Sequence, residues 1–172
     1  IVACGTAYHA GLVGSTVIEK LTRIPVQCDI ASEFRYRDPI ISDRTLVIVV
    51  SQSGETADTL AALQESRRQG AKVLAITNVP TSSVARDADY VIATKAGPEI
   101  AVASTKAYTA QLLAFYLLGI YLAQERKTLS TELHAELVGG LKALPVQVEK
   151  VLENANEVKL YAESIKDVES LF

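Results

Sequence analysis

The sequence predicts an α/β fold of three layers, in which helices cover both faces of a five-stranded parallel sheet and a helical extension follows. Two observations predict it. Short β-branched apolar runs alternate with longer segments whose apolar residues recur at helical spacing. The run at 45–50 is almost continuously apolar, which is typical of a parallel strand covered on both faces. Right-handed crossovers then join the strands into a doubly wound sheet.

Five strands are expected, at residues 1–4, 26–30, 45–50, 72–78 and 90–94. The helices expected between and after them are Tyr8–Thr22, Thr56–Gln69 and Ser104–Gln124, with a short helix or turn at 31–37. Gly70 is expected to end the second helix as its C′ residue. Our expected strand order is 2-1-3-4-5, the flavodoxin-like order of a doubly wound sheet.

The stretch after Glu125 has no strand pattern. Its expected helices are Thr131–Val138, Leu141–Asn154 and Ala155–Ile165, broken at Gly139–Gly140 and at Pro145. We therefore expect one domain at 1–128 and a helical connector at 129–172 that leads to a second domain. The sequence opens within a strand pattern and a new one starts near Val168, so a piece of a longer chain is expected.

Composition excludes several classes of protein. Apolar residues make up 49% and charged residues 22%, which is typical of globular domains and not of disordered chains. The longest apolar run, Leu112–Ala123, is shorter than the roughly 20 residues that a membrane span needs. The net charge is −3 without a basic block, so nucleic-acid binding has no support. Cys4 and Cys28 lack a disulfide framework and metal-ligand spacing, so we expect a reduced cytoplasmic protein. The sequence suggests no metal or organic cofactor.

The segment Ser51–Thr56 is the first candidate site. Ligands of doubly wound sheets bind beyond the carboxyl ends of the strands, and this segment joins an expected strand to an expected helix. It offers three hydroxyls, an amide and a glycine. Free amides and the positive end of the helix dipole would attract a phosphate. Glu55 and Asp58 oppose this, because they compete for the same positive potential, and an ordinary N-cap is the alternative.

A second loop, Cys4–Thr6, reaches the same edge of the expected sheet. Thr6 is expected to cap the following helix, and Gly5 to keep the floor of a cleft open. Cys4 as a nucleophile would need a neighbouring base. None is visible in the sequence, so a buried structural thiol is the simpler interpretation.

A third loop follows the fifth strand, at 97–106. Ser104 is the expected N-cap of the long helix, and the backbone of Val102 and Ala103 would face a ligand. Lys106 would lie near a bound anion or, alternatively, would be a solvated lysine of the first turn.

The remaining charged residues give weaker signals. His9 and His134 have no metal-ligand spacing, so each is expected at a surface or boundary position. Glu33, Arg35 and Arg37 would form either a cluster of ion pairs at an interface or a solvated charged turn. The sequence leaves both open.

Four motifs occur in order: Cys4–Thr6, the Ala-Ser-Glu-Phe-Arg-Tyr-Arg run at 31–37, Ser51–Thr59 and Val102–Ala107. Together they resemble the isomerase half of the glutamine–fructose-6-phosphate aminotransferases, across essentially the whole chain. One motif alone would indicate only the broader sugar isomerase (SIS) superfamily. The resemblance implies the first of two consecutive SIS domains, with a glutaminase domain elsewhere in the full protein.

The resemblance also implies a site for fructose 6-phosphate or glucosamine 6-phosphate. Its implied substrate-binding residues are Cys4, Gly5, Thr6, Ser51, Gln52, Ser53, Thr56, Val102, Ala103 and Ser104. The phosphate would lie against the Ser51–Thr56 segment with Thr6 nearby, and the sugar against Ser104 and the backbone of Val102 and Ala103. Members of the family often carry Ser where this sequence has Ala7, so one hydroxyl contact would be lost.

The resemblance implies that the complete enzyme makes glucosamine 6-phosphate from fructose 6-phosphate and glutamine. The family's Schiff-base lysine, enolising glutamate and ring-opening histidine map onto none of residues 1–172, so this chain alone is expected to be inactive. The alternatives are an SIS isomerase of other specificity and a non-catalytic sugar-phosphate sensor; the 31–37 and 102–107 motifs favour the aminotransferase.

A homodimer is also expected. The helix containing Leu112–Ala123 is apolar on all sides, although a helix covering one face of a sheet needs only an apolar stripe. The C-terminal helices would supply part of the cover, and a second copy of the chain the remainder, because symmetric dimers are the commonest closed assemblies.

Overall fold

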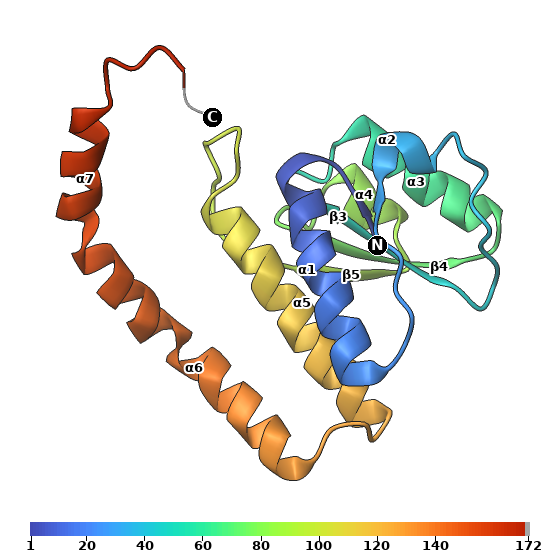
Figure 1. Cartoon of the computed structure of the whole chain (residues 1–172). Helices are drawn as coiled ribbons and strands as arrows, with labels where there is room; N and C mark the ends of the chain where they lie inside the picture. The colour runs from blue at the N-terminus through green and yellow to red at the C-terminus, as the bar shows by residue number, and fades with distance from the viewer. Residues whose placement is uncertain (171–172) are drawn as a thin grey trace. The chain divides into compact units, whose positions relative to one another are not determined.

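A computed structural model describes residues 1–170. Two compact units are present, residues 1–130 and a helical unit that begins at Thr131. In the first unit, helices cover both faces of a parallel sheet (Figure 1). Its strands are β1 (Val2–Ala3), β2 (Asp29–Ile30), β3 (Leu46–Ser51), β4 (Lys72–Thr77) and β5 (Tyr90–Ala93). Its helices are α1 (Gly5–Thr22), α2 (Ala31–Phe34), α3 (Ala57–Arg68), α4 (Ser83–Asp87) and α5 (Lys106–Glu125).

The sheet order is β2-β1-β3-β4-β5 with every pair parallel, which confirms the predicted order. The first two strands of the chain, β1 and β2, are shorter than predicted. The ladder between β1 and β2 pairs only Val2 with Asp29 and Ala3 with Ile30. The predicted strands at 1–4 and 26–30 were therefore too long: the chain turns into α1 at Gly5, and the ladder with β1 begins only at Asp29.

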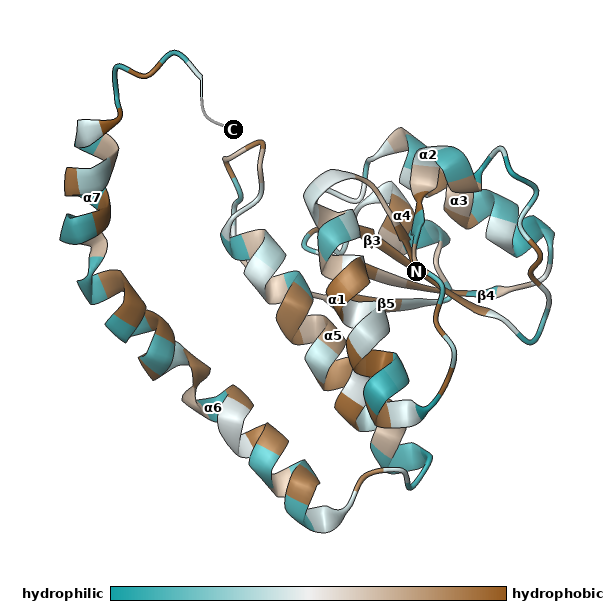
Figure 2. Ribbon diagram, viewed as in Figure 1, coloured by the Kyte–Doolittle hydropathy of each residue, from teal (hydrophilic) through white to brown (hydrophobic). Residues whose placement is uncertain are grey.

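Alternate residues of β3 face the two sides of the sheet. Val47 and Val49 pack in the core beneath α2, α3 and α4, whereas Ile48 and Val50 pack in the core beneath α1 and α5. Figure 2 shows the central strands as predominantly hydrophobic between these two helical layers. Burial on both faces explains why β3 reads as a continuous apolar run.

The helices α1 and α5 pack closely against each other. Gly14 of α1 makes this possible, because a Cβ atom at that position would lie 2.4 Å from Cδ1 of Phe115. Phe115 is fully buried. On the outer side, α5 leaves an apolar stripe exposed, formed by Leu113, Tyr116, Leu117 and Tyr121.

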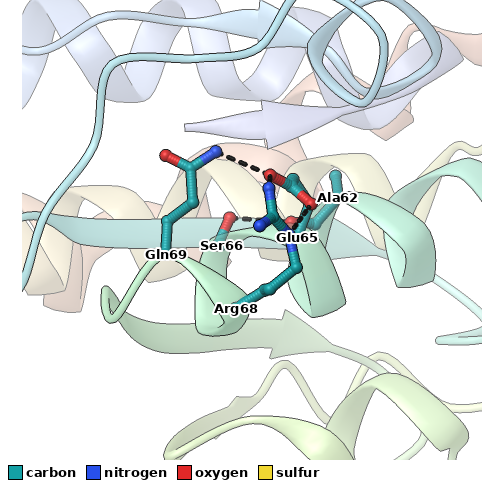
Figure 3. A network of polar contacts seen from close by, with 5 residues as sticks. All are labelled: Ala62, Glu65, Ser66, Arg68 and Gln69. Atoms are coloured by element: carbon teal, nitrogen blue, oxygen red, sulfur yellow. Dashed lines mark hydrogen bonds and ion pairs between the residues drawn. The ribbon is translucent and has the colours of Figure 1, made fainter.

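The C-terminal end of α3 carries a polar network (Figure 3). The Glu65 carboxylate accepts hydrogen bonds from Nε (2.8 Å) and Nη2 (2.6 Å) of Arg68 and from Nε2 of Gln69 (2.6 Å). The bonds from Arg68, followed by that from Gln69, lower the pKa of Glu65 to about 2. Gly70 follows α3 with φ +88°, as the expected C′ glycine.

The second unit consists of α6 (Thr131–Glu153) and α7 (Ala155–Ser164). The predicted breaks at Gly139–Gly140 and Pro145 were wrong, because α6 runs through all three residues. Each glycine costs only about 1 kcal/mol relative to alanine, and strong helix formers surround the pair. Neither helix buries a residue.

The strand expected near Val168 is not formed over 168–170, and its last two residues, 171 and 172, lie outside the described part of the chain. The helix α4 was not predicted, because Ser83–Asp87 is too short for a periodic signal. Over the described residues, no helix combines the length and the apolar character that crossing a membrane requires.

Candidate functional site

The candidate site lies at the carboxyl edge of the sheet, where the parallel strands end together. The ladder pairs Ala3 with Val50 and Ser51 with Thr77, so the ends of β1, β3 and β4 are neighbours. The strands β1 and β3 lie next to each other in the sheet although β2 comes between them in sequence. This is a switch point of the winding, where doubly wound sheets bind their ligands.

The segment Ser51–Thr56 is held together by its own hydroxyl groups. The Ser51 side chain is buried, and its Oγ lies 2.9 Å from Oγ1 of Thr56 and accepts a hydrogen bond from the Gly54 amide at 3.0 Å. Thr56 is the N-cap of α3 but makes no side-chain bond to the helix. The amides of the first turn of α3 therefore receive no cap from Thr56, which suits an anion-binding helix start.

Gly54 lets this segment lie directly on α4. Its φ is +68°, and a Cβ atom here would lie 2.0 Å from Oγ of Ser82. The Gly54 carbonyl accepts a hydrogen bond from the Val84 amide (3.0 Å), and the Gln52 carbonyl accepts one from the Asn78 amide (3.1 Å). The loop is thereby fixed to the end of β4 and the start of α4.

The two acidic residues that oppose anion binding have partners elsewhere. The Glu55 carboxylate accepts a hydrogen bond from the Ser83 amide at 2.8 Å. Hydrogen bonding to Ser83 lowers the pKa of Glu55, so the group stays charged and is held at the start of α4. Asp58 pairs with Arg35, at 3.0 Å between Oδ1 and Nη1. Both contacts reduce the competition that these carboxylates offer to a phosphate at α3.

The charged residues of the 31–37 segment make ion pairs within the chain. Besides Arg35 with Asp58, Arg37 pairs with Asp29 of β2. The sequence had left open an interface cluster or a solvated turn. These two arginines tie α2 and the turn after it to α3 and β2, while Glu33 is exposed.

The loop after β1 differs from the prediction. Helix α1 begins at Gly5, so Thr6 lies within its first turn and Cys4 occupies the N-cap position. The expected capping role of Thr6 was therefore wrong. Gly5 has φ +56°, which allows the chain to pass from β1 into α1 without a longer connection. Cys4 is half-buried and unpaired by a disulfide.

The loop between β5 and α5 is fixed at both ends by side chains that the sequence did not indicate as functional. At its start, Asn78 donates to the Gly97 carbonyl at 2.7 Å and accepts from the Ala96 amide at 2.8 Å. At its end, Oε2 of Glu99 accepts from the amides of Thr105 (3.1 Å) and Ala107 (3.0 Å). The only sequence signal for Asn78 was its place directly after a strand, and Glu99 lies too far ahead of α5 for a standard capping pattern.

Ser104 is not the N-cap of α5. Thr105 occupies that position and makes no side-chain capping bond, because Glu99 already binds the first amides. The side chain of Val102 is fully exposed, and Ala103 is exposed while Ser104 is half-buried. Lys106 is an exposed residue of the first turn whose charge contributes to lowering the pKa of Glu99.

Within the described part of the chain, neither histidine belongs to a cluster of ligating groups. His9 is exposed and packs edge-on against the ring of Tyr8, with 5.7 Å between the centroids. His134 belongs to α6 in the second unit. Among residues 1–170, no group of three or more His, Cys, Asp or Glu side chains has an arrangement that would hold a metal ion.

Curated relatives match the whole chain. It is 56% identical over its full length to the glutamine–fructose-6-phosphate aminotransferase [isomerizing] of Caldanaerobacter subterraneus, of which it covers 28%. It is 60% identical over 94% of its length to the enzyme of the same name from Clostridium acetobutylicum, of which it covers 27%. The chain thus spans less than a third of the length of these relatives, in line with the resemblance seen in the motifs.

Solved structures also resemble this chain. The C-terminal domain of glucosamine-fructose-6-phosphate aminotransferase from Francisella tularensis matches with a TM-score of 0.92 and 41% identity, over 96% of this chain and 47% of that one. Glucosamine-6-phosphate deaminase from Thermotoga maritima matches with a TM-score of 0.69 and 27% identity, over 80% and 42% of the two chains. The SIS domain model matches residues 1–121, which is more than half of the chain. The protein therefore belongs to the SIS domain family.

Proposed function

We propose that this chain is the sugar-phosphate-binding part of a glutamine–fructose-6-phosphate aminotransferase, and that it binds the phosphate of fructose 6-phosphate. The observation that carries the proposal is the start of α3, where Ser51, Ser53 and Thr56 supply hydroxyls and no side chain caps the helix. The segment contains no Lys or Arg, so hydroxyls, amides and the helix dipole would hold the phosphate.

In this proposal the substrate-binding residues come from the three loops at the carboxyl edge. The phosphate lies against 51–56 and the first turn of α1, and the sugar lies against the loop after β5. The proposed set is Cys4, Gly5, Thr6, Ser51, Gln52, Ser53, Thr56, Val102, Ala103 and Ser104. The diversion of Glu55 to Ser83 and of Asp58 to Arg35 supports an anion at this place.

The role of the chain is to position the substrate. The phosphate takes no part in the chemistry, and holding it fixes the reacting carbons of the open-chain ketose beside the catalytic groups. Those groups would add ammonia from glutamine, move protons between C1 and C2, and release glucosamine 6-phosphate. They lie outside this chain, so we propose that the chain alone does not turn over fructose 6-phosphate and ammonium.

The proposed partners follow from the proposal that the chain is part of this aminotransferase. They are a second SIS domain, a glutaminase domain and a second copy of the chain, in the cytoplasm. The exposed apolar stripe on α5, formed by Leu113, Tyr116, Leu117 and Tyr121, supports an interface between copies. An SIS isomerase of other specificity is the second candidate, supported by the likeness to glucosamine-6-phosphate deaminase.

Titration of the chain with fructose 6-phosphate tests the proposal. The variant Thr56→Val removes one proposed phosphate donor while keeping the shape of the side chain. We expect fructose 6-phosphate to bind at least about tenfold more weakly to this variant, because hydrogen bonds to charged groups contribute about 1.5–3 kcal/mol.

Thr16→Val is the matched control, since the Thr16 hydroxyl is exposed and donates only to the Leu12 carbonyl of its own helix. Equal binding by Thr56→Val and the wild type would refute the phosphate assignment. Preference for a different sugar phosphate over fructose 6-phosphate would favour the second candidate.

A further inference from the structure

The loop between β5 and α5, residues 94–105, has no regular secondary structure. It is longer than the median connection of about 4–6 residues in compact domains, and long loops often carry function. At its start, the Asn78 side chain bonds to the backbone of Ala96 and Gly97, and Thr94 donates to Oδ1 of Asn78 at 3.2 Å. This fixes the beginning of the loop to the end of β4.

Glu99 fixes the other end. Its Oε2 accepts hydrogen bonds from the Thr105 amide at 3.1 Å and the Ala107 amide at 3.0 Å, and Oε1 lies 3.4 Å from Oγ1 of Thr105. The carboxylate therefore sits at the positive end of α5, a helix of 20 residues. Hydrogen bonding, above all from the Ala107 amide, lowers the pKa of Glu99.

These bonds close the segment 100–104 into a short loop. Burial does not shape it, because the side chains of Ile100 and Val102 are 93% and 104% exposed. The Glu99 carboxylate is the contact that returns the chain to the start of α5. Without it, the segment would lose its main anchor at that end.

We propose that Glu99 is the positioning residue of the sugar side of the site, which rests on the proposed function. Its carboxylate takes the anion position at the start of α5, and so the start of α3 is left for the substrate phosphate. At the same time it holds 102–104 in the conformation that contacts the sugar. Glu99 touches no reacting atom and acts through the loop.

Inorganic phosphate and fructose 6-phosphate are two probes that distinguish binding of the phosphate from binding of the sugar. Each is titrated into the 172-residue chain, and binding is followed by 1H–15N NMR. In Glu99→Ala we expect the affinity for inorganic phosphate to change by less than about twofold. The affinity for fructose 6-phosphate should fall by about tenfold, because a loosened loop must be ordered again when the sugar binds. Glu99→Gln keeps one acceptor oxygen, so its affinity for fructose 6-phosphate should be intermediate between those of Glu99→Ala and the wild type.

Amide hydrogen exchange tests the geometry without any ligand. Thr105 and Ala107 should exchange faster in Glu99→Ala than in the wild type, and Glu99→Gln should again lie between them. Glu65→Gln is the matched control: it also removes a hydrogen-bonded carboxylate, but from the C-terminal end of α3, and should change neither the two affinities nor these amides.

Three results would overturn the inference. They are unchanged exchange at Thr105 and Ala107, an equal loss of affinity for both probes, and no loss for either. If the wild type binds fructose 6-phosphate no better than inorganic phosphate, the proposed function fails instead. The exchange rates would then still decide whether Glu99 holds the loop.

Discussion

Single residues at the carboxyl edge have two kinds of role: some would bind the proposed anion, and some keep the loop in place. Ser51 has both roles, since its hydroxyl joins the Gly54 amide to Thr56 and is also one of the hydroxyls proposed to bind the phosphate. Glu55 also keeps the loop in place, because its carboxylate binds the Ser83 amide instead of competing for the start of α3. The sequence identified the hydroxyl-rich segment, but it presented Glu55 as an obstacle. Its partner lies 28 residues away in the chain, a distance that local pattern does not span.

Gly54→Ala should destabilise the first unit strongly. The left-handed φ of +68° costs about 1–2 kcal/mol for any other residue. The added Cβ would lie 2.0 Å from Oγ of Ser82, and relieving such overpacking costs about 1–3 kcal/mol more. Urea unfolding measures the difference.

Gly70→Ala is the control, because its φ of +88° is equally unfavourable but its nearest neighbour, the Asp43 amide nitrogen, is 3.9 Å away. Gly70→Ala should therefore lose only the unfolding free energy that the left-handed backbone costs. Equal losses of stability in the two variants would show that the close approach to Ser82 is unimportant.

The titration of Glu65 gives a prediction for pH. The pKa of about 2 lies below the ordinary 4.5, so the stability that this carboxylate contributes is present above pH 4.5 and is lost as the pH falls toward 2. In Arg68→Gln the midpoint of Glu65, followed by carboxyl 13C NMR, should rise toward 4.5. Glu55 should keep its lowered pKa in this variant, because that shift comes from Ser83. An unmoved Glu65 midpoint would assign the shift to another group.

At the scale of elements, the strand order and the start of α3 were predictable from the sequence, whereas the starts of α1 and α5 were not. Apolar runs identify β3 and β4 because burial on both faces selects the whole run. The starts of α1 and α5 depend on single contacts instead. Gly5 with positive φ starts α1 three residues before the expected Tyr8, and Glu99 takes over the capping that Ser104 was expected to provide. Neither contact leaves a periodic signal.

Gly14→Ala tests the packing of α1 against α5. Alanine is the better helix former by up to about 1 kcal/mol, so an isolated helix would gain stability. In this chain the new methyl group would meet the buried ring of Phe115 at 2.4 Å, so we expect a net loss of unfolding free energy. Gly139→Ala is the opposite case: nothing lies within 4 Å of its Cβ position, and the helicity of α6 by circular dichroism should rise. If Gly14→Ala instead stabilised the chain, α1 and α5 would pack less closely than the 2.4 Å approach to Phe115 implies.

At the scale of the whole molecule, the fold places three loops from separate strands at one edge and leaves apolar surface on α5. The exposed stripe includes Leu117 and Tyr121. We expect the chain to sediment as a dimer at micromolar concentration, and Leu117→Asp or Tyr121→Asp to convert it to the 18.5 kDa monomer. Ile40→Asp, at an exposed position outside the stripe, should stay dimeric. If the wild-type chain sediments with a mass of 18.5 kDa at every concentration, it is a monomer and the proposed homodimer is wrong.

We propose that hydroxyls and amides at the start of α3 hold the substrate phosphate without a basic side chain. A crystal structure of the chain with fructose 6-phosphate tests it most directly. We expect phosphate oxygens within hydrogen-bond distance of the hydroxyls of Ser51, Ser53 or Thr56 and of the first amides of α3, with no Lys or Arg among the contacts. A phosphate bound at another strand end, or held by a Lys or Arg side chain while the Ser51–Thr56 segment stays empty, would contradict it.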